Sequence, residues 1–213
     1  MQNTDYFTLL SEQLPLAKNL SEQKNAMGFL GQEILRFNSI AGTLINSFKL
    51  DVHASIDERY ITHPLIRSLL ENYFKIIYIF DDSELEGERF EKAVNGFKID
   101  YLKLINDLKQ VAWDVFMREY EASLQSPNDD WNNLPKLNNI NDILTALKNE
   151  AGDKLQYLYS IYRITSFDVH GNSLKFFFDK AFGTQCDFLI LDIRYVINLI
   201  ASSYIELLNK HKS

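Results

Sequence analysis

The chain has 213 residues, of which 46% are hydrophobic, so it is long enough to bury a sizeable core in one domain. Its formal net charge of −7 excludes a global positive field that would gather nucleic acid or an anionic membrane, although a local cleft could still bind RNA. The single cysteine, Cys186, excludes an intramolecular disulfide, and the sequence contains no CxxC or HxxxH pair for a metal. We therefore expect no metal, no cofactor and a cytoplasmic location.

Composition also limits the fold class. Eight Gly and four Pro leave few places for turns, and short alternating strands bounded by Gly or Asn-Gly are absent from the sequence. The sequence therefore predicts an all-α protein, a single-domain bundle of about six to eight helices over residues 1–213.

No membrane segment is predicted. The N-terminal residues lack the basic stretch and the long apolar core of a signal peptide. The most apolar segment, residues 188–208, is interrupted by Asp192, Arg194 and Glu206, which makes it too polar for a membrane span. The protein is therefore expected to be soluble, with no membrane partner.

In chain order, residues 4–19 have the apolar spacing of a helix, which Pro15 should bend or end. A long helix is predicted next, because apolar residues from Met27 to Phe48 keep three-and-four spacing for about six turns. Residues 51–60 are polar, so we expect a connection there, with at most a short turn of helix.

The following helix is predicted over residues 64–80, since Pro64 is tolerated in a first helical turn. Its apolar end, IIYIF, could be a β-strand, but the spacing of the apolar residues before it favours one continuous helix. Arg67 and Glu71 lie four residues apart on this helix and can pair across one turn.

An amphipathic helix is predicted over residues 85–108 and a shorter one over residues 113–124. Residues 125–139 are dense in Asn, Asp and Pro, which predicts a surface loop. An ordered lid over a site is the alternative. Asn139 is expected to cap a helix that ends near residue 149.

The last part of the chain contains two further predicted helices. One should end at His170-Gly171, because a Gly commonly follows the last helical residue. The other, residues 188–209, is apolar around much of its circumference. We expect it to be either central to the bundle or part of a dimer interface.

The stretch YLYSIYRITSFDVHGNS, residues 157–173, contains the strongest candidate for chemistry. Arg163, Ser166 and His170 are spaced three and four residues apart, so they share one side of the predicted helix. Three aromatic side chains flank them: Tyr159, Tyr162 and Phe167. An Arg and a His that converge there could hold a phosphate and move a proton, or they could form a buried polar pair.

Two motifs together resemble a bacterial family of all-helical proteins known as a domain of unknown function. The first motif is Arg67-x3-Glu71 within the apolar helix. The second is YxxYRxxSxxxHG, which begins at Tyr159. The resemblance covers residues 62–174, so the first helices and the last one contribute little to it.

More loosely, Arg163-x6-His170 is similar to the Arg-x4-6-His signature of the HEPN superfamily, which includes RNases of toxin and phage-defence systems. This resemblance implies metal-independent RNA cleavage, with His170 as general acid or base and Arg163 neutralising phosphate charge. It further implies that Ser166 binds the phosphate, that Glu71 orients Arg163 or His170, and that the site forms across a homodimer. Ile164 departs from the polar residue usual at that position in active HEPN nucleases.

Two other roles remain open for these residues. They could form a polar network that fixes how the helices pack, or they could hold a small anionic ligand in a non-enzymatic binding protein. Asp168 is expected to face away from Arg163, and the nearby aromatic side chains are expected to belong mostly to the core. The catalytic candidates are Arg163 and His170, and the binding candidates are Arg67, Glu71, Tyr162 and Ser166.

Overall fold

The computed structural model describes residues 4–51, 53–148, 152–169, 174–184 and 191–211. Within these residues the protein is all-α, as predicted, with ten α-helices, eight of them of seven or more residues, and no β-strand. The helices are α1 (Tyr6–Ser11), α2 (Leu14–Ser21), α3 (Ala26–Ser47), α4 (Ile56–Phe80), α5 (Glu86–Leu108), α6 (Asp114–Tyr120), α7 (Ile140–Thr145), α8 (Asp153–Val169), α9 (Leu174–Phe182) and α10 (Ile193–Lys210). Three short 3₁₀ helices, Val111–Trp113, Glu121–Ser123 and Asp129–Asn133, lie between α5 and α7.

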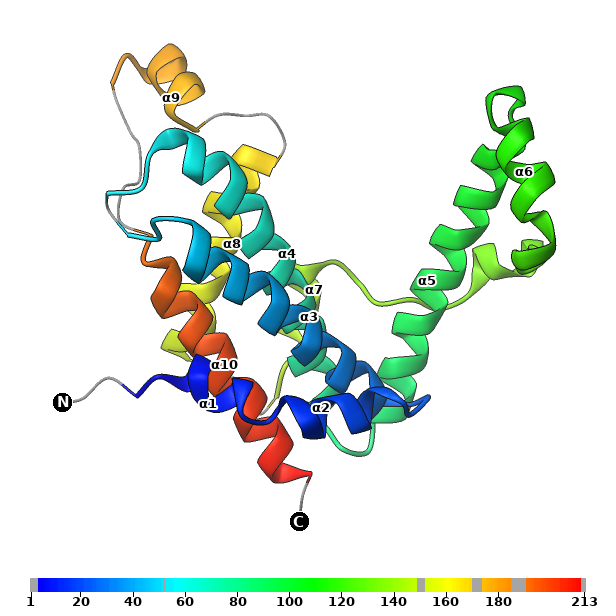
Figure 1. Cartoon of the computed structure of the whole chain (residues 1–213), viewed down its shortest axis with the longest axis horizontal. Helices are drawn as coiled ribbons and strands as arrows, with labels where there is room; N and C mark the ends of the chain where they lie inside the picture. Colours follow the sequence, from blue (N-terminus) through cyan, green and yellow to red (C-terminus); the bar gives the residue numbers. More distant parts are fainter. Residues whose placement is uncertain (1–3, 52, 149–151, 170–173, 185–190, 212–213) are drawn as a thin grey trace.

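The core lies where α3, α4 and α10 meet (Figure 1). Its largest fully buried side chains include Phe37, Tyr73, Phe74 and Tyr204. The ring of Tyr204 packs edge-on against Phe37 and Tyr73, with ring centroids 5.4 Å and 6.0 Å away. Such aromatic contacts add specific geometry to the burial of apolar area. The apolar face of α10 is therefore used inside the chain's own core.

The start of α4 differs from the prediction. A capping box begins the helix eight residues before Pro64, because the Ser55 side chain accepts from the Glu58 N–H while Glu58 accepts from the Ser55 N–H. Pro64 therefore lies inside α4 rather than in its first turn. A proline inside a helix removes one main-chain hydrogen bond. The capping box and the burial of α4 stabilise the helix and offset this loss.

The break at Pro15 is confirmed, since α1 ends before it and α2 begins with Pro15 in its first turn. The long helix predicted after it is also confirmed as α3, which has 22 residues. Helices α2 and α3 pack closely because Gly31 lets the backbone of α2 approach. A Cβ at Gly31 would lie 2.6 Å from both the Ala17 carbonyl oxygen and the Ser21 nitrogen.

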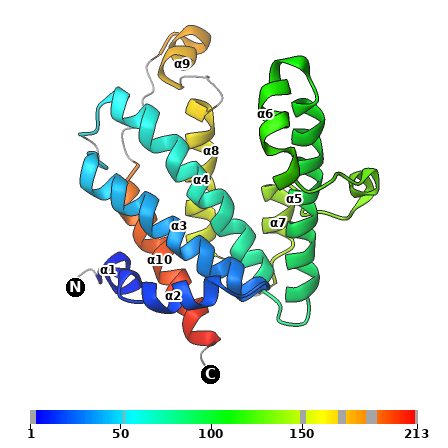
Figure 2. The ribbon, with the colours of Figure 1, turned by 45° about the vertical axis from the view of Figure 1, so that its right-hand side comes forward.

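Helices α5 and α6 form an arm that extends from the other helices (Figures 1 and 2). Arg89 anchors the base of the arm and is only 4% exposed. It donates to the Tyr78 carbonyl, packs over the Tyr78 ring at 4.2 Å and pairs with Asp81 at 3.7 Å. Phe97 and Leu104, farther along α5, remain exposed.

Several predicted boundaries in the second half are wrong. The helix predicted over 113–124 is the shorter α6, flanked by 3₁₀ helices, whereas the connection predicted over 125–139 is confirmed and contains only the 3₁₀ helix Asp129–Asn133. Asn139 does cap α7, accepting from the Asp142 N–H, but α7 ends at Thr145. The last helix begins at Ile193, where Asp192 caps it, and residues 185–190 lie outside the described residues.

Among the described residues, none of the helices combines the length and apolar character needed to cross a membrane.

Candidate functional site

Helices α4 and α8 lie side by side and run antiparallel (Figures 1 and 2). His63, near the start of α4, contacts Asp168 near the end of α8, whereas Phe74 packs against Tyr162 with ring centroids 5.8 Å apart. The buried face of α8 comprises Leu155, Leu158, Ile161 and Thr165. This α4–α8 interface brings together side chains that are about a hundred residues apart in sequence.

Arg67 crosses from α4 to α8. Its Nη1 donates to the Ser166 hydroxyl oxygen, and its Nη2 donates to the Tyr162 hydroxyl at 3.1 Å. The guanidinium carbon lies 4.3 Å from the centroid of the Tyr162 ring, within the range of a cation–π interaction. Among the described residues, no carboxylate pairs with Arg67. Neutral hydroxyls and a ring hold this cation in place.

Tyr162 is the centre of the cluster. Burial raises the pKa of its phenol, while the charges of Arg67 and Arg163 act in the opposite direction and that of Glu71 adds to the rise. Its ring stacks with Tyr159 at a centroid distance of 6.1 Å and an interplanar angle of 23°. Two cations and a pair of aromatic rings therefore lie within electrostatic reach of one phenol.

The Ser166 hydroxyl makes hydrogen bonds within the protein, whereas the sequence suggested that it binds phosphate. Its hydroxyl donates to the Tyr162 carbonyl at 2.7 Å and accepts from Arg67. A fully ionised phosphate only accepts hydrogen bonds, so the proton of Ser166 would reach it only by leaving that carbonyl. In the present geometry Ser166 orients Arg67.

Glu71 points elsewhere. It pairs with Lys75 at 3.4 Å, and no pair between Glu71 and Arg67 occurs among the described residues. Both cations are four residues from Glu71, but an acid that precedes its base along a helix is the better arrangement. The side chain of Glu71 lines a pocket beside α5 that is described below.

His63 and Asp168 form a pair that sequence spacing did not indicate. The His63 Nδ1 lies 2.5 Å from an Asp168 carboxylate oxygen, and the two side chains are only 6% and 11% exposed. The expectation that Asp168 faces away from Arg163 agrees with this pairing. The residues are 105 positions apart, and only the antiparallel packing of α4 and α8 brings them together.

Arg163 is exposed on α8, and no described residue forms a hydrogen bond or ion pair with it. His170, the second catalytic candidate, lies outside the described residues, as does Gly171. Helix α8 is described as far as Val169, the residue before His170. Four of the six candidates, Tyr162, Arg163, Ser166 and Arg67, therefore lie on or against one side of α8.

Metal ligands were not expected from the sequence. In the described part of the chain, no group of three or more His, Cys, Asp or Glu side chains is close enough to hold a metal ion.

Comparison with protein families finds one match. The model described as "Family of unknown function (DUF5677)" matches residues 57–183, which include all but the first residue of α4, the whole of α8 and all the candidate residues. No curated protein and no solved structure matches the chain.

Proposed function

Because the chain belongs to the family of unknown function DUF5677, whose description names no activity, we propose a function from its own geometry. We propose that it binds RNA phosphate on the α8 flank, the side of α8 that carries Tyr159, Tyr162, Arg163 and Ser166. We further propose that it is a HEPN-like, metal-independent ribonuclease, an effector of a toxin or phage-defence system. The observation that carries phosphate binding is that two arginines adjoin Tyr162: Arg67 packs over its ring at 4.3 Å and donates to its hydroxyl, and Arg163, the next residue on α8, is exposed.

The arrangement suits a phosphodiester for three reasons. Arg67 is held by neutral groups, so among the described residues its charge has no carboxylate partner to displace. Arg163 is exposed, and a guanidinium binds phosphate oxygens through two parallel N–H donors. The rings of Tyr159 and Tyr162 stack on each other beside these charges, and bases of single-stranded RNA commonly stack on aromatic rings.

In the proposed reaction the RNA 2′-oxygen forms a bond to the adjacent phosphorus as the bond from phosphorus to the 5′-oxygen breaks. One imidazole removes the 2′-hydroxyl proton, and a proton is returned to the leaving 5′-oxygen. We assign one of these transfers to His170, because it follows α8 directly and because an imidazole titrates near neutral pH. Arg163 stabilises the negative charge that develops on the phosphate oxygens.

A second candidate function is binding of a phosphate-bearing ligand without cleavage. One observation favours it: the Arg67 guanidinium donates hydrogen bonds to Tyr162 and Ser166, as an arginine that holds two helices together would. Ile164, in place of the polar residue usual in active HEPN nucleases, points the same way.

Cleavage of a labelled RNA pool in EDTA separates the two candidates. The proteins to compare are the wild type, His170→Ala, Arg163→Ala and Arg118→Ala. Arg118 is a matched control because it is an exposed arginine on α6, in the arm. Circular dichroism establishes that each variant is folded.

The nuclease proposal predicts cleavage by the wild type and by Arg118→Ala, loss of cleavage in His170→Ala, and a loss of about 10²-fold or more in Arg163→Ala. If the folded wild type binds RNA but leaves it intact, the second candidate is correct. If it neither binds nor cleaves RNA, the nuclease proposal is wrong.

A further inference from the structure

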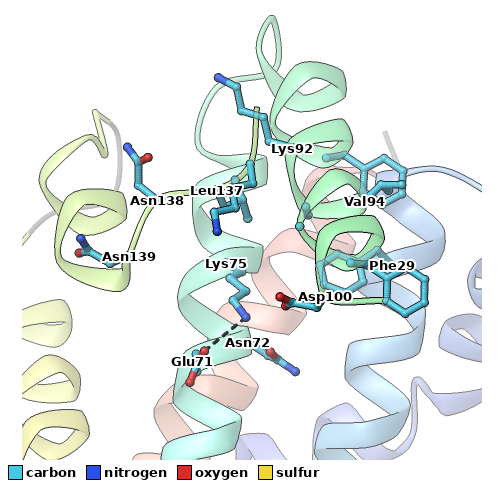
Figure 3. A pocket seen from close by; sticks show the side chains of 15 residues that line it. Phe29, Glu71, Asn72, Lys75, Lys92, Val94, Asp100, Leu137, Asn138 and Asn139 are labelled. Carbon is cyan, nitrogen blue, oxygen red and sulfur yellow. Dashed lines mark hydrogen bonds and ion pairs between the residues drawn. The ribbon is translucent and has the colours of Figure 1, made fainter. Parts of the chain in front are cut away.

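A second site begins on α4 one turn beyond Arg67, at Glu71. It is a pocket of about 650 Å³ between α3, α4, α5 and the segment that precedes α7 (Figure 3). This volume falls within the usual range of small-molecule sites, about 300–1,000 Å³. The pocket and the α8 flank share only the helix α4, and none of Arg67, Tyr162 and Arg163 lines the pocket.

One wall of the pocket is apolar. The rings of Phe29 on α3 and Phe90 on α5 meet there with centroids 6.2 Å apart and planes tilted by 41°. Val94 and Leu137 extend this wall. Aromatic and aliphatic lining of this kind suits the flat apolar body of a small ligand.

The polar side carries more positive than negative charge. Three lysines line the pocket, Lys75, Lys92 and Lys136, against two carboxylates, Glu71 and Asp100. Most of these charges already have a partner: Glu71 pairs with Lys75, Asp100 pairs with Lys103, and Lys92 pairs with Glu88 at 2.6 Å, and neither Lys103 nor Glu88 lines the pocket. Lys136 forms no hydrogen bond or ion pair with any described residue, although the hydrogen bond from Lys103 lowers the pKa of Asp100 and the charges of Lys136 and Lys75 add to that lowering.

The segment that carries Lys136 is fixed in place. Asn95, which is 4% exposed, donates from its side chain to the Pro135 carbonyl at 3.0 Å. This bond holds the main chain at Pro135 against α5, so the backbone that carries Lys136 is positioned before any ligand arrives. On the floor, the Asn72 amide donates to Glu33 at 2.9 Å.

We propose that this pocket binds a small amphiphilic anion, with its flat apolar body against Phe29 and Phe90 and its carboxylate, phosphate or sulfate group at Lys136 and Lys75. The aromatic wall recognises the body, and the lysines recognise the charge. Recognition therefore needs both parts of the ligand. The inference does not depend on RNA binding at the α8 flank.

Isothermal titration calorimetry with four probes tests this inference. The probes are 2-naphthoate and 1-naphthyl phosphate as anions with an aromatic body, 2-naphthalenemethanol as the neutral analogue, and acetate as the anion without the body. We expect both aromatic anions to bind in the range up to about 1 mM, and each of the other two to bind at least about tenfold more weakly.

Two pairs of variants locate the binding. Lys136→Ala should weaken the binding of 2-naphthoate about tenfold. Lys18→Ala, which removes an exposed lysine on α2, should leave this binding unchanged. Gly96→Leu should weaken binding at least about tenfold, because Gly96 lines the pocket and the longer side chain would occupy part of it beside Lys136, whose Cβ would lie 3.9 Å from the new Cβ. Gly87→Leu, on the same helix with open space around it, should leave binding unchanged.

Three results would overturn the inference: no binding of either aromatic anion, equal affinity for the neutral alcohol, or undiminished binding in folded Gly96→Leu. Arg163→Ala distinguishes the two sites. If it abolishes 2-naphthoate binding while Lys136→Ala does not, the anion binds at the α8 flank instead, and the pocket has no such function.

Discussion

At the scale of single residues, the polar side chains between α4 and α8 fall into two groups with different consequences. His63 and Asp168 are almost entirely buried and bond to each other, so each would lose its hydrogen-bond partner if the other were removed. Arg163 is exposed, so its removal should leave the fold intact. Substitution of Asp168 should therefore lower stability, whereas substitution of Arg163 should weaken RNA binding in a folded protein.

Asp168→Ala should destabilise the protein by about 1–3 kcal/mol, because His63 keeps its buried ring nitrogen without the bond it makes to Asp168. His63→Ala should cost a similar amount, and the double variant should cost less than the sum of the two. Urea unfolding of the three variants measures this coupling. Strictly additive losses would show that the pair contributes nothing as a pair.

At the scale of single elements, α3 contains two glycines with opposite roles. A Cβ at Gly31 would collide with the backbone of α2, whereas at Gly42 its nearest neighbour would be the Phe7 Cζ at an ordinary 3.8 Å. Gly31→Ala should therefore destabilise the protein by about 1–3 kcal/mol through overpacking. Gly42→Ala should stabilise it by about 0.5–1 kcal/mol through helix propensity. Thermal unfolding of both variants checks the signs, and a stabilising Gly31→Ala would contradict the close approach of α2.

The capping box of α4 makes part of the stability depend on pH. Backbone N–H donors of Ser55 and Lys49 lower the pKa of Glu58 from its ordinary 4.5 to about 2. Because the folded value is the lower one, the contribution of the carboxylate is fully present above pH 4.5 and is lost as the pH falls towards 2.

Comparison of the wild type with Glu58→Gln tests this pH dependence. The wild type should be the more stable near neutral pH, and its advantage should shrink across the acidic window, as followed by urea unfolding at several pH values. Glu119→Gln, on α6, is the charge-matched control. An advantage that stays constant down to pH 2 would contradict the role of the ionised cap.

At the scale of the whole molecule, apolar periodicity was enough to predict the all-α class and the long helices α3, α4 and α5. It failed at the start of α4, because Pro64 suggested a first turn and the stronger signal was the Ser55–Glu58 capping box. Motifs singled out Arg67, Tyr162 and Ser166 as candidates, but their contacts were not predicted, because the sequence suggested that Arg67 pairs with Glu71. The His63–Asp168 pair was not predicted, because no local pattern encodes a contact between helices so far apart in sequence.

The oligomeric state is a further proposal at this scale. The proposed HEPN-like function implies a homodimer, and the apolar face of α10 is already buried in the chain's own core. Light scattering coupled to size exclusion should give roughly twice the chain mass of 24.8 kDa. A mass equal to that of one chain would contradict a site formed across two chains. It would not contradict phosphate binding by a single chain.

The most direct test of the α8 flank is the anisotropy of a labelled 2′-O-methyl RNA, which cannot be cleaved because its attacking hydroxyl is blocked. Arg163→Ala should bind about tenfold more weakly than the wild type and show a shallower dependence on salt, since one phosphate contact is lost. Arg118→Ala should bind like the wild type. Equal affinity of Arg163→Ala and the wild type would contradict phosphate binding on α8.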